Sequence, residues 1–162
     1  MPINMLFHEK YILASSSKSR YKILKNVGFN FIQVKPTCDE EKIKNQIKKK
    51  NVLPHEIAKI LSHEKAKSIS MKDKYINKKI IGCDTIICLN KKIFDKAKNI
   101  SEARKKIKIL SGKTHKIISA ITICKNGKKI WQCFLTTDVK VRDLSKKDID
   151  KYLKNTGKNI LQ

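Results

Sequence analysis

Long apolar runs are missing from the sequence, since none reaches the roughly 18 residues that a membrane-spanning helix needs. The first residues also lack the basic start and the long apolar segment of a secretory signal peptide. Prolines number only three and glycines five, and no repeat or low-complexity linker divides the chain. We therefore expect a cytoplasmic protein without a membrane partner, and 162 residues with 40% apolar content suffice to bury a core.

Cysteine pairs with metal-binding or redox spacing are also missing. The five cysteines are Cys38, Cys83, Cys88, Cys124 and Cys133, and no two of them form a C-x-x-C pair. This spacing argues against a zinc knuckle and a thioredoxin-like motif. An odd number of cysteines in a chain expected in the cytoplasm indicates buried free thiols.

Acidic residues are scarce, with 14 Asp and Glu against 38 Lys and Arg, and the formal net charge is +24. Such a charge favours polyanions, namely nucleic acid, a membrane surface or nucleotide phosphates. The excess is nearly all lysine and is spread along the chain, whereas arginine, the better reader of bases and phosphates, is rare. We interpret the charge mainly as a diffuse background, with a selected polyanion surface as the alternative.

The most informative stretch that is present covers residues 80–89, Ile-Ile-Gly-Cys-Asp-Thr-Ile-Ile-Cys-Leu. Apolar and β-branched residues on both of its faces predict a central strand. Asp84 lies inside this strand, and a carboxylate in apolar surroundings is costly unless it is paired, metal-bound or protonated. Gly82 removes a side chain where another group could approach the backbone. Asp84 is therefore either a satisfied structural residue or an acid presented to a site.

A second candidate site lies near the start of the chain. Residues 11–14 predict a short strand, which leads through a serine-rich turn into a helix that Gly28 ends. A strand, a small hydroxylated turn and a helix N-terminus form an arrangement that binds phosphate through backbone N–H groups and the helix dipole. Serines in this place also serve simply as helix caps. The helix presents one apolar face, formed by Tyr21, Ile23, Leu24 and Val27.

The rest of the chain alternates between strands and helices, which predicts a mixed α/β domain. Further strands are predicted at residues 30–34, 93–96, 115–124 and 129–141, the last two joined by an Asn126-Gly127 hairpin. Further helices are predicted from Pro54 to about residue 71, from 101 to 110, and from a capping box at Ser145 to Gly157.

An acidic group, Asp39-Glu40-Glu41, follows the strand at residues 30–34 and is conspicuous in so basic a chain. It could supply a Mg²⁺ ligand, form a solvated loop or begin a helix. The Lys-rich residues 42–51 are expected to be an exposed helix end or a loop.

Five separated motifs resemble the Maf family of nucleotide pyrophosphatases. Residues 13–24 resemble the family opening L-A-S-x-S-P-R-R-x-x-L-L, and residues 38–41 resemble its D-E motif. Residues 64–66, 82–85 and 110–115 resemble the family motifs E-K-A, G-A-D-T and L-S-G-R-T-H. The resemblance spans nearly the whole chain. It implies a single domain over residues 1–162, with a mixed, twisted central sheet flanked by helices, in an inosine-triphosphatase-like architecture of two lobes around a nucleotide cleft.

The activity that the resemblance implies is hydrolysis of a standard or modified nucleoside triphosphate to the monophosphate and pyrophosphate. Asp84 would accept the proton of the attacking water, and Glu40 and Asp84 would hold a divalent cation, Mg²⁺ or Mn²⁺. Ser19 occupies a position associated with nucleobase selection. The groups expected to bind the substrate are Ser15, Ser17, Arg20, Lys65, Thr85 and Lys96.

The sequence departs from the family pattern at three places. Lys18-Ser19 replaces a common Pro-Arg, so the usual pyrimidine preference does not carry over, and Lys96-Ala97 replaces a common Lys-Pro. The chain also stops where the family continues for several segments, so we interpret it as C-terminally truncated. A homodimer is plausible from the resemblance alone.

Two alternatives to an active enzyme stay open. One is a non-catalytic, basic nucleic-acid-binding protein, which the +24 charge favours but the 6% aromatic content and the rarity of arginine disfavour. The other is an inactive truncated member of the family, in which the loss of the last strands exposes a sheet edge.

Overall fold

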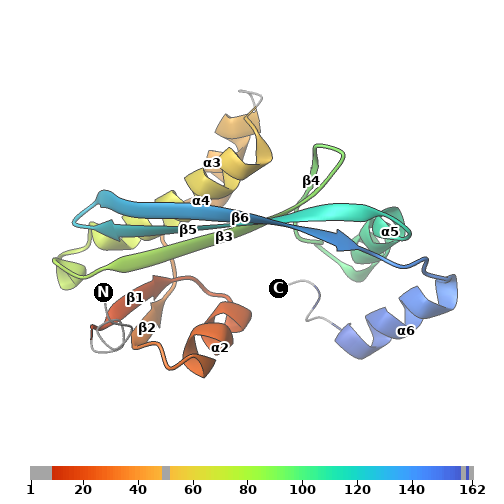
Figure 1. The fold of residues 1–162 in the computed structure, drawn as a ribbon, viewed down its shortest axis with the longest axis horizontal. Helices are drawn as coiled ribbons and strands as arrows, with labels where there is room; N and C mark the ends of the chain where they lie inside the picture. The colour runs from red at the N-terminus through yellow and green to blue at the C-terminus, as the bar shows by residue number, and fades with distance from the viewer. Residues whose placement is uncertain (1–8, 49–51, 158–159, 161–162) are drawn as a thin grey trace. The chain divides into compact units, whose positions relative to one another are not determined.

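The computed structural model describes residues 9–48, 52–157 and 160, which form the helices and strands labelled in Figure 1. The chain divides into two compact units. The first contains residues up to 85 together with residues 119–135, and the second contains residues 86–118 and 136–162. We describe each unit by itself, and the single domain expected over residues 1–162 stays a prediction.

The described strands form an open sheet in the order β2-β1-β3-β5-β6, with β4 paired to β3. Its members are β1 (Tyr11–Ala14), β2 (Phe31–Val34), β3 (Ile80–Leu89), β4 (Lys92–Phe94), β5 (Thr114–Lys125) and β6 (Lys128–Lys140). Strand β1 is parallel to both β2 and β3, whereas β4 is antiparallel to β3. The predicted mixed α/β fold is therefore confirmed. Strands β3, β5 and β6 each contribute residues to both units.

The first unit covers both faces of β1 with apolar side chains. Its helices are α2 (Lys18–Asn26), α3 (Glu40–Lys48) and α4 (Pro54–Ser70), followed by the short 3-10 helix η1 (Asp73–Tyr75). On one face, α4 packs Ala66 and Ile69 against a core that includes Ile12 and Ile80. On the other face, a second cluster contains Tyr11, Leu13 and Ile81, with Leu24 of α2 packed against it. This two-sided burial explains why β1 is apolar throughout.

The second unit contains α5 (Ile100–Leu110) and α6 (Lys146–Thr156), which share a core of Ala103, Ile149 and Leu153. The predicted capping box is confirmed, because Ser145 and Asp148 exchange side-chain and backbone hydrogen bonds at the start of α6. The hydrogen bond from Arg142 holds the pKa of Asp148 well below its usual range. Gly157 ends the helix with a positive φ of 53°, as its position in the sequence predicts.

Three expectations need correction. Residues 40–48 form a complete helix rather than only a helix end, with Glu40 and Glu41 in its first turn, while residues 49–51 lie outside the described part. The apolar face predicted for α2 is largely solvent-exposed at Tyr21, Ile23 and Val27, although Leu24 packs against the sheet and the edge of the Tyr21 ring contacts Phe31 of β2. All five thiols are free, but only Cys88 and Cys124 are buried.

Among the described helices, none has the length and apolar character needed to cross a bilayer.

Candidate functional site

Most of the predicted site residues of the first unit gather where β1 ends. The last residue of β1, Ala14, pairs with Gly82, and β3 continues past this point with Cys83, Asp84 and Thr85. The serine turn that follows β1 leads directly into the N-terminus of α2. In open α/β sheets, ligands bind beyond the carboxyl ends of parallel strands, and helix N-termini at such ends favour anions.

A buried ionic cluster joins α3, α4 and β3. The Nζ atom of Lys65 donates a hydrogen bond to Oδ1 of Asp84 at 2.6 Å and lies 3.0 Å from Oε2 of Glu40. Lys65 and Asp84 are only 7% and 8% exposed, whereas the Glu40 side chain is 42% exposed. Burial of a charge is tolerated when it is paired, so Lys65 satisfies the carboxylate that the sequence places in an apolar strand.

The close approach of α4 to β3 builds this cluster. A Cβ atom at Gly82 would overlap the carbonyl oxygen of Ser62 and would lie 2.7 Å from the backbone nitrogen of Ala66. Ser62 also bonds Thr122 of β5 through their hydroxyls, at 2.7 Å. The glycine therefore lets α4 lie directly on the sheet, which brings Lys65 within reach of Asp84.

Burial raises the pKa of the Asp84 carboxyl, and the positive charges of Lys65 and Arg20 act in the opposite direction. Removal of water from around a carboxylate disfavours its charged form. A carboxyl with a raised pKa is better matched to accepting a proton near neutral pH than an ordinary aspartate is.

A second, hydrogen-bonded group surrounds Arg20 in the first turn of α2. Its guanidinium donates from Nη1 to Oγ of Ser15 at 3.3 Å and from Nη2 to Oγ1 of Thr85 at 3.2 Å. Ser17 is the N-cap of α2, because its hydroxyl accepts a hydrogen bond from the backbone N–H of Arg20. The serine of the turn thus acts as a cap, and Arg20 is held at the end of β1 by two separate elements.

Ser119 of β5 extends this group and was not singled out from the sequence. Its hydroxyl lies 3.1 Å from that of Thr85, whose oxygen already accepts a hydrogen bond from Arg20. One serine in an alternating strand carries no signal by itself. Only the placement of β5 beside β3 brings it next to the site.

Two predicted site residues, Ser19 and Lys96, are not members of these two groups. Ser19 is exposed in the first turn of α2. Lys96 is exposed and belongs to the second unit, where its backbone carbonyl accepts a hydrogen bond from Lys106 at 3.1 Å. The structure brings together Glu40, Lys65 and Asp84 in one group, and Ser15, Ser17, Arg20 and Thr85 in the other.

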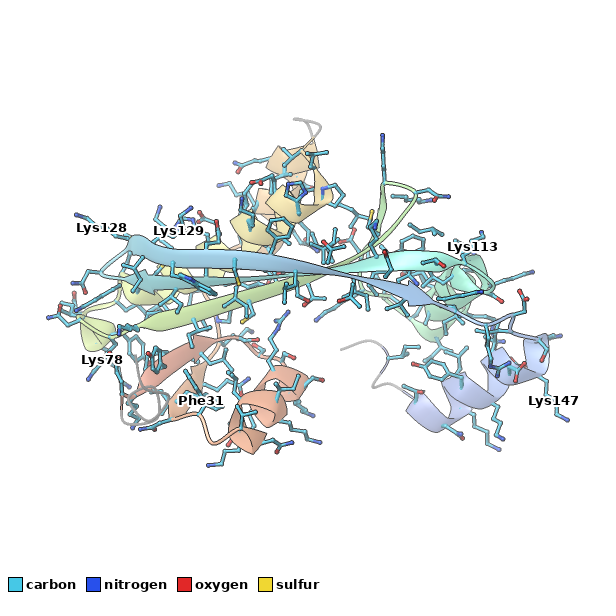
Figure 2. The ribbon with its side chains drawn as sticks, viewed as in Figure 1. Phe31, Lys78, Lys113, Lys128, Lys129 and Lys147 are labelled. Carbon is cyan, nitrogen blue, oxygen red and sulfur yellow. The ribbon has the colours of Figure 1, made fainter. Side chains whose placement is uncertain are left out.

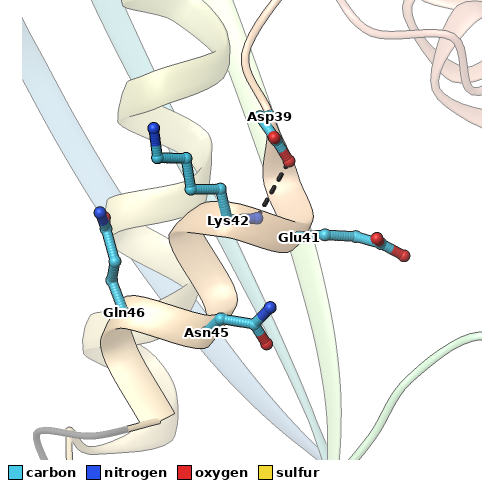
Figure 3. A pocket seen from close by; sticks show the side chains of 5 residues that line it. All are labelled: Asp39, Glu41, Lys42, Asn45 and Gln46. Carbon is cyan, nitrogen blue, oxygen red and sulfur yellow. Dashed lines mark hydrogen bonds between the residues drawn. The ribbon is translucent and has the colours of Figure 1, made fainter.

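A surface hollow of about 390 Å³ lies along α3, lined by Asp39, Glu41, Lys42, Asn45 and Gln46 (Figure 3). Asp39 accepts a hydrogen bond from the backbone N–H of Lys42 at 2.9 Å, which caps the helix. None of the lining residues belongs to either polar group described above. We therefore place the candidate site at the end of β1 and not in this hollow.

The two carboxylates of the ionic cluster, Glu40 and Asp84, are oxygen donors of the kind that a divalent cation takes. Glu40 and Asp84 already converge on one positive atom, Nζ of Lys65. In the described part of the chain, no three His, Cys, Asp or Glu side chains gather as a metal site. Mg²⁺ commonly takes one or two carboxylates from the protein and its other oxygens from phosphates and water, so two acids meet its requirements.

The chain is similar to known proteins over most of its length. A family model described as Maf-like protein matches residues 10–160. A 7-methyl-GTP pyrophosphatase of Bartonella henselae is 37% identical over 153 residues, which cover 94% of this chain and 75% of that protein. A nucleoside triphosphate pyrophosphatase of Caulobacter vibrioides is 35% identical over 149 residues, which cover 92% of this chain and 73% of that protein.

A solved structure of a HAM1 protein from Coxiella burnetii is similar with a TM-score of 0.47 and 12% sequence identity, covering 82% of this chain and 72% of that one.

Proposed function

Because the chain belongs to the Maf family, we propose that it is a nucleoside triphosphate pyrophosphatase, which releases pyrophosphate and a nucleoside monophosphate. The observation that carries this proposal is the buried pairing of Lys65 with Asp84 beside the Arg20 group at the end of β1. The curated relatives described above carry names for the same class of reaction.

The Arg20 group supplies the donors that a triphosphate requires. The guanidinium of Arg20, the hydroxyls of Ser15 and Ser17 and the N-terminus of α2 together favour a polyanion. Arg20 is held between Ser15 and Thr85, so its orientation is fixed before the substrate binds. Preorganised donors of this kind stabilise the charge that develops on transferred phosphates.

In the proposed reaction, Asp84 is the base that activates the attacking water. The oxygen of water bonds to the α-phosphorus, its proton passes to the Asp84 carboxylate, and the bond from the α-phosphorus to the bridging oxygen breaks, so that pyrophosphate leaves. Lys65 orients the carboxylate through its 2.6 Å hydrogen bond. A divalent cation held by Glu40 and Asp84 would supply charge neutralisation at the phosphates.

The activity is tested by pyrophosphate release from a panel of nucleoside triphosphates that includes the four standard ones and 7-methyl-GTP. We expect release that requires Mg²⁺ or Mn²⁺ and stops on addition of a chelator. The panel also shows which base the chain prefers with Ser19 in place of the family's arginine. A folded chain that releases no pyrophosphate from any of these substrates would contradict the proposal.

Replacing Ser119 by alanine is expected to raise KM for the nucleoside triphosphate about threefold to tenfold and to change kcat by less than twofold. Ser119 bonds Thr85, which in turn holds Arg20, so its loss loosens a phosphate-binding group by about one hydrogen bond, worth about 1 kcal/mol. Ser119→Thr keeps the hydroxyl and is expected to restore KM. Steady-state kinetics separate the two constants, and an equal loss in both variants would contradict the positioning role.

A further inference from the structure

Two segments of the first unit meet at the turn of the β5–β6 hairpin, and we call them together the basic tip. They are residues 71–79, which contain η1, and residues 125–131, which contain the turn and the first residues of β6. We refer to these two segments as the loops of the basic tip. The backbone N–H of Asn77 donates to Oδ1 of Asn126 at 2.7 Å, and the amide of Asn126 donates back to Oδ1 of Asn77 at 3.0 Å. The N–H of Gly127 bonds the hydroxyl of Ser70 at 3.2 Å. These contacts lock the two loops together, so their side chains are presented as a unit.

The basic tip concentrates positive charge. Figure 2 shows Lys78, Lys128 and Lys129 projecting at this end of the strands. Among the described residues, Lys79 has an ion-pair partner, Glu9, whereas Lys72, Lys78 and Lys128 have none. Asp73 is the acid within the two loops. The lysines of the basic tip are Lys72, Lys74, Lys78, Lys79, Lys125, Lys128 and Lys129.

Large apolar side chains are exposed between these lysines. Met71 is 66% exposed, Ile76 54%, Ile130 52% and Trp131 48%. Ile130 and Trp131 are consecutive residues of β6, so their side chains lie on opposite sides of the strand and apolar groups flank the basic tip on both. Isolated exposed apolar residues are ordinary, but four of them on two joined segments mark a candidate interaction site. The basic tip thus combines aliphatic side chains, a tryptophan and a dense set of lysines.

We propose that the basic tip docks on an anionic lipid surface, with the lysines at the phosphate headgroups and the apolar side chains in the boundary with the acyl chains. Lysine-rich segments are attracted to anionic leaflets, and Trp prefers the headgroup level of a membrane. Met71 and Ile76 favour a lipid surface over a nucleic acid as the partner. Burial of aliphatic side chains in lipid is favourable, whereas contact with the phosphates of a nucleic acid stabilises them little. The absence of arginine from both loops also separates the basic tip from typical base-reading surfaces.

Peripheral docking differs from the expectations drawn from sequence alone. No helix of the described residues is long and apolar enough to cross a bilayer, but contact with a membrane surface needs no such helix. The interpretation of the charge as diffuse background also treats each lysine separately, whereas the Asn77–Asn126 contacts bring two lysine-bearing loops into one surface.

Trp131 makes a direct test possible, since it is the one tryptophan of the chain. The full chain is titrated with vesicles of phosphatidylcholine alone and of phosphatidylcholine with phosphatidylglycerol, while the tryptophan emission and its quenching by acrylamide are followed. We expect a blue shift and reduced quenching only with the anionic vesicles, weakened by added salt. Vesicle binding that leaves the emission unchanged, or no binding at low salt, would overturn the proposal.

The matched variants change three lysines each. Replacing Lys72, Lys78 and Lys128 by glutamine is expected to weaken vesicle binding about a hundredfold, because each lysine near an anionic surface contributes about a factor of five. Replacing the exposed Lys146, Lys147 and Lys151 of α6 by glutamine removes the same charge from another part of the chain. This variant is expected to change vesicle binding by less than threefold. Equal effects in both variants would show charge-only attraction and would overturn the proposal. So would duplex DNA or RNA binding more tightly than the vesicles at equal salt.

Discussion

Replacing Asp84 by asparagine is expected to lower kcat for pyrophosphate release by a factor of about 10² to 10⁴, which is the range for loss of a general base. Asparagine has nearly the same shape, so it keeps the hydrogen-bonding position beside Lys65 but cannot accept the proton of water. Glu40 remains as a partner for Lys65, so we expect the melting temperature to change by no more than a few degrees.

The pH dependence gives this prediction a second readout. Only the deprotonated carboxylate acts as a base, so activity falls as the pH drops through the pKa of Asp84. Because burial raises that pKa, the acid limb of kcat/KM is expected above the ordinary aspartate range near about pH 3.9. Ionisation of a buried group with a raised pKa also costs the folded state free energy as the pH rises. As the pH rises from the pKa of Asp84 in the unfolded chain to its higher pKa in the folded chain, the free energy of unfolding of the wild type should therefore decrease relative to that of Asp84→Asn.

The control is Asp138→Asn, which makes the same chemical change at an exposed ion pair with Lys116 in the second unit. This variant is expected to keep its activity, since exposed ion pairs contribute little. Activity near the wild-type level in a folded Asp84→Asn protein would rule out Asp84 as the base.

Replacing Gly82 by alanine is expected to destabilise the protein by about 4 kcal/mol, at the upper end for single substitutions. The added Cβ would overlap the carbonyl oxygen of Ser62 and crowd the backbone of Ala66, and neither backbone atom can rotate away. Helix α4 must therefore move off β3, which opens the core around Ile69 and Ile80. Thermal unfolding measures the effect, and a loss of about 10 °C corresponds to it for a chain of this size.

The same displacement separates Lys65 from Asp84, so activity in Gly82→Ala is expected to fall at temperatures where the fold persists. Gly157→Ala is the comparison, because a Cβ there meets no atom of the described residues within 4 Å and the cost comes from a φ of 53°. We expect about 1 to 2 kcal/mol for that variant and no effect on kinetics. A Gly82→Ala protein as stable as Gly157→Ala would show that α4 is not in direct contact with β3.

The sequence was sufficient for elements with strong local signals. Residues 80–89 form the strand that their apolar, β-branched character predicts, and Asn126-Gly127 and Ser145 mark the hairpin and the capping box. These features depend on the backbone preferences of a few neighbouring residues, so they can be predicted from the sequence. By contrast, exposure on α2 depends on what packs against it, so the sequence alone could not distinguish partly buried Leu24 from exposed Ile23.

Which residues of the candidate site contact one another could not be predicted from local sequence patterns. Lys65 and Asp84 were each singled out, but their pairing depends on α4 lying on β3, which Gly82 permits. Ser119 shows the same limit more strongly, because only the adjacency of β3 and β5 gives it a role. Contacts between residues far apart in sequence are set by topology, and a spacing rule cannot supply them.

The division of the first unit into two stretches of sequence has a consequence for synthesis on the ribosome. Ser62 of α4 meets Thr122 of β5 only after residues 86–118 have been translated. Until β5 emerges, the nascent chain carries β1, β3 and α4 without the strand that completes their core, which contains Cys124. Contacts over such separations form late and slowly. We therefore expect this protein to acquire its first protease-resistant fragment only after residue 135 has left the exit tunnel.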